Sequence, residues 1–293
     1  MSSREVVEGW VVVVSRSGRL DLMTVRGYRH PSGELVVSPY MSFSRRLKSY
    51  DFREVEEFVR FVDCIGRHAP VIAESLVVTY IDPERALKVR RADLDPRVLE
   101  LLDTLAPEWA GLTGSWAVFS EKPGSDVDLL VYGDSSKLYR ALQDLRDEGL
   151  IRSCRLEDRL EKTRDLSGPK LSALLAGRRL LDSCYKEHPY TIRVLERLDR
   201  EPCSERVYYW GRYEGLVKIE EVLGAPAVPT RYRAVLLDIG VEAVLETWHT
   251  RFAELPRGVY TARLVLLEER GVVKASPDVD GWIEVEQVGD RGS

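Results

Sequence analysis

The chain has 293 residues, with 43 Lys and Arg against 48 Asp and Glu, which gives a formal net charge of −5 at pH 7. This balance argues against a protein whose whole surface binds polyanions, and 44% hydrophobic residues argue against a disordered chain. No apolar run approaches the roughly 20 residues that a transmembrane helix needs, and the start shows no signal-peptide pattern. We therefore expect a soluble, cytoplasmic protein with two domains, or one core with flanking modules.

Amide side chains are nearly absent: there is no Asn, and Gln occurs only at Gln143 and Gln287. Thermophilic proteins avoid these residues, so the pattern predicts a thermophile source, and GC-rich codon usage explains it equally well. The four cysteines contain no Cys-x-x-Cys pair, which excludes a zinc ribbon and favours buried thiols, with one disulfide expected in a hyperthermophile. They are Cys64, Cys154, Cys184 and Cys203.

Residues 1–68 are expected to form a β-meander followed by a helix. Runs of Val and Leu separated by Ser17-Gly18 and by Pro31-Ser32-Gly33 are typical of strands joined by turns. From Phe52 to Ile65 the apolar spacing changes to that of one helix face. Asp51 is the expected cap of this helix, and Gly66 its end.

Residues 69–200 show the alternation of helices and strands expected of a mixed α/β core. Asp95-Pro96 is a strong helix start, because the carboxylate caps the first turn and proline fits its geometry. The expected elements after that helix are a strand around Leu112, a strand Val127 to Tyr132, a helix capped by Ser135, strands Leu150 to Leu156 and Tyr190 to Leu195, and an Arg-rich helical segment from Glu157 to Asp182.

Strand-like segments dominate residues 201–288, which suits a small β-barrel or sandwich module. One helix, about Val241 to Glu254, is expected to interrupt them, and the aromatic run Tyr208-Tyr209-Trp210 is expected to lie in a strand core. Taken together, the segments predict an α/β (α+β) protein, with β-rich N- and C-terminal modules on either side of the core.

The stretch from Leu112 to Tyr132 carries the candidate chemistry. Asp126 and Asp128 are separated by one residue on a predicted strand, and strand side chains alternate between faces, so both carboxylates are expected on the same side. Two such charges repel each other unless a cation lies between them, and Mg²⁺ or Mn²⁺ prefers oxygen ligands of this kind. Gly114 allows close approach of a phosphate, and Ser115 offers a hydroxyl and an N–H. The alternative is an ordinary turn and a strand whose acids face solvent.

These residues resemble the signature of the DNA polymerase β-type nucleotidyltransferase superfamily. That signature is Gly-Ser or Gly-Gly, a spacer, and then Asp-h-[Asp/Glu]-h, where h is hydrophobic; here it is met by Gly114-Ser115 and by Asp126 to Leu129. The chain is also similar to a group of archaeal predicted nucleotidyltransferases, in which Gly-Tyr-x-His-Pro (here residues 27–31) precedes the core. The resemblance implies a nucleotidyltransferase-type mixed sheet.

The same resemblance implies a reaction and a set of roles. Asp126 and Asp128 would be catalytic and would hold Mg²⁺ or Mn²⁺, and a nucleoside triphosphate would transfer its nucleoside monophosphate to a hydroxyl acceptor. Further phosphate-binding residues would be Gly114, Ser115, Ser125 and Arg193.

The family's third carboxylate has no clear counterpart, because Arg193 stands where it is expected, and Glu157 is the substitute. The acceptor is unknown, with RNA, a small molecule or a protein side chain as options. A catalytically degenerate protein that binds a nucleotide or RNA is the alternative, and no membrane partner is expected.

Overall fold

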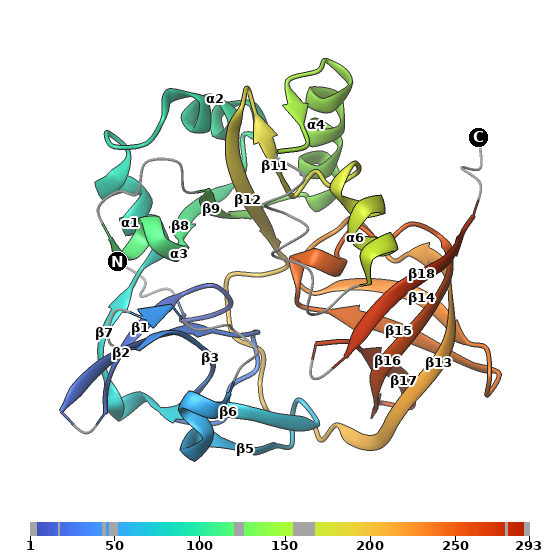
Figure 1. Ribbon diagram of the computed structural model, residues 1–293. Helices are drawn as coiled ribbons and strands as arrows, with labels where there is room; N and C mark the ends of the chain where they lie inside the picture. Colours follow the sequence, from blue (N-terminus) through green and yellow to red (C-terminus); the bar gives the residue numbers. More distant parts are fainter. Residues whose placement is uncertain are drawn as a thin grey trace.

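The computed structural model describes residues 5–16, 18–42, 45–46, 52–119, 126–154, 168–278 and 281–289. Strands account for 47% of the structure and helices for 22%. Three β-sheets organise the chain, and most of the helices lie beside one of them (Figure 1). The predicted α/β (α+β) fold class with a nucleotidyltransferase-type core is therefore wrong: the protein is mostly β. Segments that we expected to be helical contribute to this difference, because they pair as strands.

The first sheet, called the N-terminal sheet, is antiparallel throughout and has the strand order β5-β6-β3-β2-β1-β7, with β4 paired to β3. Its strands are β1 Val11–Arg16, β2 Arg19–Val25, β3 Glu34–Ser42, β4 Arg45–Arg46, β5 Val59–Val62, β6 Arg67–Ala73 and β7 Val77–Ile81. Two 3-10 turns, η1 Arg53–Phe58 and η2 Glu74–Leu76, interrupt them. The expected meander is present, and β6 and β7 continue the sheet past residue 68.

The predicted helix from Phe52 to Ile65 is wrong. Its first half is η1 and its second half is β5, which pairs with β6. Phe61 meets the ring of His68 across the two strands, with ring centroids 5.4 Å apart. Because a partner strand offers cross-strand contacts to β-branched and aromatic residues, the tertiary pairing overrides the helical spacing.

The central sheet has five strands in the order β10-β11-β12-β9-β8, and only the β12–β9 pair is parallel. Its strands are β8 Trp109–Thr113, β9 Val127–Tyr132, β10 Ile151–Arg152, β11 Asp182–Tyr185 and β12 His188–Leu195. The helices beside this sheet are α1 Pro83–Arg90, α2 Pro96–Leu105, α3 Gly114–Val118 and α4 Ser135–Asp147. The helix α6 Pro169–Ala176 packs instead on the third sheet, where Leu171 and Leu175 join the buried core.

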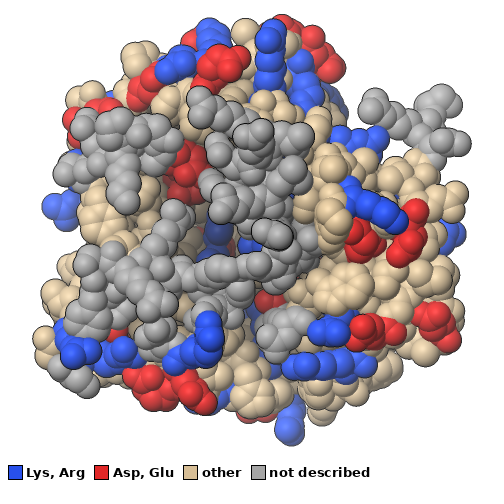
Figure 2. All heavy atoms as spheres, in the orientation of Figure 1, with Lys and Arg blue, Asp and Glu red and all other residues tan. Residues whose placement is uncertain are grey.

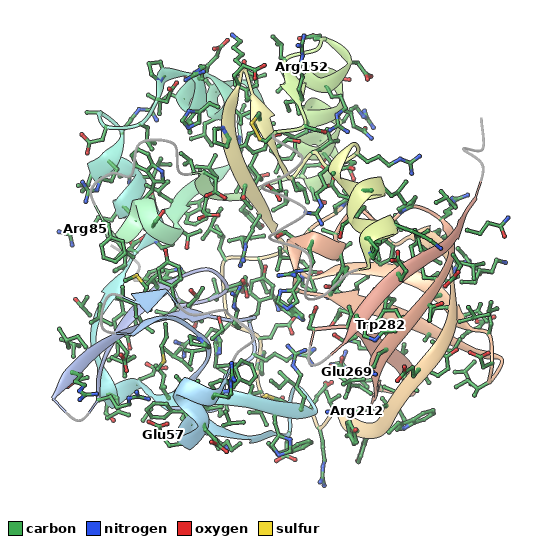
Figure 3. The ribbon with its side chains drawn as sticks, viewed as in Figure 1. Glu57, Arg85, Arg152, Arg212, Glu269 and Trp282 are labelled. Carbon is green, nitrogen blue, oxygen red and sulfur yellow. A yellow bond between two sulfur atoms is a disulfide. The ribbon has the colours of Figure 1, made fainter. Side chains whose placement is uncertain are left out.

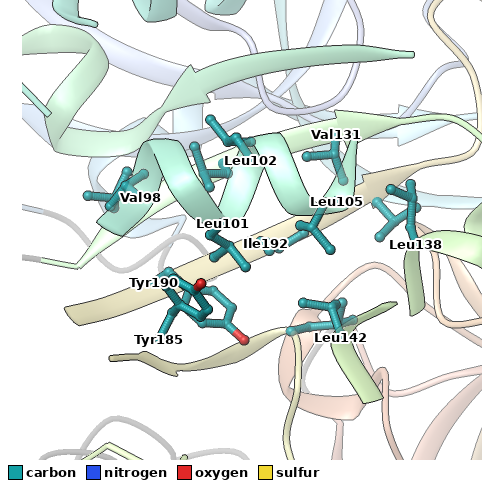
Figure 4. Close-up of a cluster of buried hydrophobic side chains, with 14 of the residues drawn as sticks. Val98, Leu101, Leu102, Leu105, Val131, Leu138, Leu142, Tyr185, Tyr190 and Ile192 are labelled. Carbon is teal, nitrogen blue, oxygen red and sulfur yellow. The ribbon is translucent and has the colours of Figure 1, made fainter. Parts of the chain in front are cut away.

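Helices α2 and α4 pack on one face of the central sheet (Figure 4). Leu101 and Leu142 are fully buried there together with Leu129 and Ile192 of the strands. Asp95 caps α2 by accepting from the N–H of Arg97, as predicted. The cap of α4 is Asp134 rather than Ser135, because the Asp134 carboxylate accepts from two backbone N–H groups of the first turn. The opposite face of the sheet is therefore free of α2 and α4.

The third sheet closes on itself, because β13 pairs with both β14 and β16; we call it the C-terminal barrel. Its strands are β13 Tyr208–Val222, β14 Thr230–Leu236, β15 Val241–Thr247, β16 Gly258–Glu269 and β17 Val272–Ser276, with β18 Trp282–Val288 added beside β16. The turn η3 Thr250–Phe252 follows β15. On the face in Figure 2, basic and acidic side chains are interspersed.

Two predictions for the barrel are wrong. The segment expected as a helix from Val241 to Glu254 begins with β15, where buried Ala243 and Leu245 alternate with more exposed residues in register with β14. The aromatic run Tyr208-Tyr209-Trp210 is not strand core: the three residues are 55%, 50% and 54% exposed. A register shift between Tyr209 and Gly211 accompanies this exposure.

Long-range links join the three sheets. The Thr113 hydroxyl donates to the carbonyl of Gly9 at 2.6 Å, and the Tyr28 hydroxyl donates to the carbonyl of Val228 at 2.8 Å. A disulfide between Cys64 and Cys203 ties the N-terminal sheet to the chain that enters the barrel. The second disulfide, Cys154–Cys184, closes a loop at the central sheet, so the expectation of four thiols is wrong.

Candidate functional site

The turn from β8 into α3 lies directly against Asp128. Thr113, the last residue of β8, pairs with Asp128 in the antiparallel register of β8 and β9. Gly114 follows with a φ of 64°, in the left-handed region that favours glycine. A Cβ added to Gly114 would collide with the Asp128 carboxylate, whose Cγ would lie 2.9 Å away. Both the backbone angle and the close approach therefore require glycine here.

Alternation along β9 explains why Asp128 is available to this turn. Val127 and Leu129 are fully buried in the core under α2 and α4, whereas Asp128 between them is partly exposed on the opposite face. Asp126 comes immediately before the strand and is also partly exposed. Asp126 lies outside β9, so a position of its carboxylate on the side of Asp128 stays a prediction.

Ser115 and Trp116 follow in α3, which is a single five-residue turn beginning at Gly114 rather than at Trp116. The carbonyl of Ser115 accepts from the N–H of Phe119 at 2.8 Å, and its side chain is partly exposed. Trp116 is buried in the core under the sheet, and its indole N–H has no hydrogen-bond partner among the described residues. A turn this short gives no basis for assigning a helix dipole to the site.

The neighbouring strand β12 runs parallel to β9, and its register identifies the residue beside Asp128. That residue is Thr191, which carries a hydroxyl and no carboxylate. Arg193 pairs with Leu130, two positions farther along the same face. The expected third carboxylate is therefore absent from the β12 position in register with Asp128. Sequence reasoning missed Thr191, because a strand alignment only becomes visible once β12 is placed beside β9.

Arg193 is held by a buried acid that the sequence did not single out. Its Nη1 lies 2.6 Å from Oε1 of Glu8, whose side chain is completely buried. The same Oε1 atom pairs with Nη1 of Arg26 at 3.1 Å, and Oε2 accepts from the N–H of Gly27 at 2.7 Å. Glu8 thus bridges two arginines from different sheets. The predicted phosphate-binding role of Arg193 stays a prediction, because its guanidinium already has this partner.

Two candidate residues, Ser125 and Glu157, lie outside the described residues. Within the described part of the chain, no three His, Cys, Asp or Glu side chains are grouped so that they would hold a metal ion. Of the predicted metal ligands, the Asp126 and Asp128 carboxylates are the donor set to consider. Two carboxylates suit a cation that keeps several water or phosphate ligands, as Mg²⁺ does in nucleotide sites.

Comparison with known proteins gives no relative: no family model, no curated protein and no solved structure matches the chain. The resemblance to the nucleotidyltransferase superfamily, and the thermophilic and archaeal source, therefore stay predictions. None of the helices in the described ranges is long and apolar enough to cross a membrane.

Proposed function

We propose that the chain binds a divalent cation and a nucleoside triphosphate at Gly114, Asp126 and Asp128, and transfers the nucleoside monophosphate to a hydroxyl acceptor. The observation that carries the proposal is the contact between Gly114 and the Asp128 carboxylate. A bare glycine backbone beside a partly exposed acid lets a phosphate chain approach the backbone while its bound cation reaches the carboxylate.

The reaction would be an in-line displacement at the α-phosphorus. The oxygen of the acceptor hydroxyl forms a bond to phosphorus and its proton passes to water. The bond from phosphorus to the bridging oxygen breaks, and pyrophosphate leaves with that electron pair. A bound Mg²⁺ or Mn²⁺ would offset the negative charge that develops on the phosphate oxygens. Asp126 and Asp128 would hold the cation, and Ser115 would offer donors to the phosphates. RNA, a small molecule and a protein hydroxyl remain the acceptor classes to test.

One observation favours a second candidate function, nucleotide binding without transfer. The residue beside Asp128 on β12 is Thr191, and a threonine hydroxyl is not a base that takes a proton from the acceptor at neutral pH. With this position occupied by a hydroxyl, the site retains its cation ligands and lacks an acid in register to activate the acceptor. The two functions make different predictions for turnover and the same prediction for binding.

Isothermal titration with ATP, with and without Mg²⁺, tests the shared claim. Binding should require Mg²⁺ and should be lost in the double variant Asp126→Ala, Asp128→Ala. The matched control is Asp144→Ala, Asp147→Ala, which removes two exposed acids from α4 and leaves the turn intact. Retention of Mg²⁺-dependent binding in the first double variant would exclude the site.

Release of pyrophosphate in the presence of RNA or small hydroxyl acceptors then separates the two functions. Transfer predicts release that depends on the acceptor and on both acids. Mg²⁺-dependent binding with no release from any acceptor would support the second function instead.

A further inference from the structure

A cavity of about 140 Å³ lies between the N-terminal sheet and the C-terminal barrel, and its lining comes from segments far apart in the sequence. Tyr28 and Trp248 form an aromatic part of its wall, with ring centroids 5.5 Å apart. Glu269, labelled in Figure 3, belongs to the side of the barrel that faces the N-terminal sheet. The volume exceeds that needed for a single water, so the cavity has room for a small molecule.

Most charges along the cavity cancel in pairs. Arg29 pairs with Glu201 and Glu269, and each of the two barrel cations also contacts two carboxylates. Those cations and their partners are Arg231 with Glu196 and Glu246, both at 2.8 Å, and Lys274 with Glu246 at 3.3 Å and Glu269 at 2.5 Å. These cations are satisfied by the protein itself, so they leave little attraction for a ligand.

Arg67 differs from these cations. Its side chain is only 21% exposed, and its one ion pair within the described residues is a long one, 3.9 Å from Nη1 to Oδ2 of Asp278. Asp278 is itself engaged elsewhere, because it accepts from the Thr247 hydroxyl and the Trp248 N–H, both at 2.7 Å. Among the described residues the Arg67 guanidinium makes no hydrogen bond to a protein acceptor, so its donors are left to water or to a ligand.

Besides the Asp278 carboxylate, the cavity wall near Arg67 offers a further arginine and an imidazole. Arg26 lines the same cavity and shares its carboxylate, Glu8, with Arg193. His249 also lines the cavity, and burial followed by the nearby Arg251, Arg26, Arg193 and Arg67 keeps its pKa well below the ordinary value, so the imidazole is neutral. Its ring makes no hydrogen bond within the described ranges, and is therefore able to donate one to a ligand.

We propose that this cavity binds the phosphate group of a small molecule, with Arg67 as the main anchor and Arg26 and His249 beside it. A tetrahedral phosphate accepts hydrogen bonds from several directions, which suits donors that arrive from two different sheets, whereas a carboxylate suits one planar fork. The cavity shares no lining residue with the Gly114–Asp128 turn, so this proposal stands apart from nucleotidyl transfer.

Titration calorimetry with inorganic phosphate tests the proposal on the full chain. We expect Arg67→Met to weaken phosphate binding at least about tenfold, because a charge-assisted hydrogen-bond pair is lost. Arg91→Met is the matched control: Arg91 also has a single long ion pair, 3.8 Å to Asp103, on an exposed surface, and its loss should leave binding unchanged. The Asp126→Ala, Asp128→Ala variant should bind phosphate normally. Equal affinity in the two arginine variants would overturn the proposal.

A measurement on the unaltered protein covers the case in which the Arg67 variant does not fold. Butanedione modifies accessible arginines, and peptide mass spectrometry reports each site. Phosphate should slow the modification of Arg67 and leave that of Arg91 unchanged, and acetate at the same concentration should protect Arg67 less. No protection by phosphate, or equal protection by acetate, would contradict a phosphate site.

Discussion

The turn at Gly114 and the cavity beside Arg67 are built in opposite ways. The turn draws its cation ligands and its glycine from one short stretch of chain, held by the pairing of β8 with β9. The cavity draws its lining from residues between Arg26 and Asp278, and the Cys64–Cys203 disulfide joins the N-terminal sheet to the chain that enters the barrel beside it. We therefore expect the turn to depend less than the cavity on links between distant parts of the chain.

Removing the Cys64–Cys203 disulfide should have the largest effect. The bond closes 139 residues of chain, and chain-entropy arguments give a loss of about 5 kcal/mol in the free energy of unfolding for Cys64→Ala, Cys203→Ala. Because Cys64 lines the cavity, phosphate affinity should fall as well. Chemical denaturation and phosphate titration measure the two effects.

The matched control is Cys154→Ala, Cys184→Ala, which opens a loop of 30 residues. We expect a smaller loss, about 4 kcal/mol, with phosphate affinity unchanged. An equal loss of phosphate affinity in both double variants would contradict a cavity that depends on the Cys64–Cys203 bond in particular.

Glu8→Gln should break the bridge that the Glu8 carboxylate forms between Arg26, at the cavity, and Arg193 of β12. It removes a fully buried charge that neutralises both Arg26 and Arg193, so the free energy of unfolding should fall by about 3 kcal/mol. The control is Glu57→Gln: Glu57 is 54% exposed and pairs with Arg16, and its replacement should have little effect. Denaturant titration of both variants measures the free energy of unfolding. Similar values for the two variants would show that the buried Glu8 charge does not stabilise the fold.

Gly114→Ala should disturb the turn and leave the cavity intact. The left-handed angle and the collision with Asp128 together should lower the free energy of unfolding by about 2 kcal/mol and remove Mg²⁺-dependent nucleotide binding. Gly240 has the same φ of 64° with no atom within 4 Å of an added Cβ, so Gly240→Ala measures the cost of the angle alone, about 1 kcal/mol. Equal losses in the two variants would mean that Asp128 does not press on Gly114.

His249→Gln should change how stability depends on pH. In the folded protein, burial and then the surrounding arginines keep the pKa of His249 well below 6.5, so the unfolded chain binds a proton that the folded chain does not. Stability is therefore present above pH 6.5 and falls as the pH is lowered. Between pH 7 and about pH 5 the variant should lose about 1–2 kcal/mol less than the parent protein.

Denaturation at the two pH values measures this difference. Burial also lowers the pKa of His30, to about 3, and that of His188. Both contribute equally in the parent protein and the variant, so the comparison isolates His249. An identical pH dependence would show that the imidazole takes up its proton in the folded state.

The sequence predicts what local rules determine. The cap at Asp95 and the alternation around Asp128 follow from the chemistry of a few adjacent residues, and both are found in the structure. The segment from Phe52 to Ile65 was misread because its apolar spacing fits one helix face as well as a 3-10 turn followed by a strand. Only the partner β6, whose position is a tertiary fact, decides between them.

The other features of the turn and of the cavity cannot be predicted from adjacent residues alone. Nothing near Glu8 in the sequence marks it as the carboxylate that joins Arg26 to Arg193, because these residues are 18 and 185 positions away from it. The residue beside Asp128 on β12 depends on a parallel register that no hairpin turn fixes. The mostly β architecture likewise follows from pairings between distant strands, and it overturned the predicted fold class.

Electron paramagnetic resonance of Mn²⁺ tests the central claim most directly, because free Mn²⁺ gives a six-line signal that weakens on binding. Adding the protein with ATP should reduce this signal beyond the effect of ATP alone, and the reduction should vanish in the Asp126→Ala, Asp128→Ala variant while persisting in Asp144→Ala, Asp147→Ala. An unchanged reduction in the first double variant, or none with the parent protein, would contradict a cation–nucleotide site at Gly114 and Asp128.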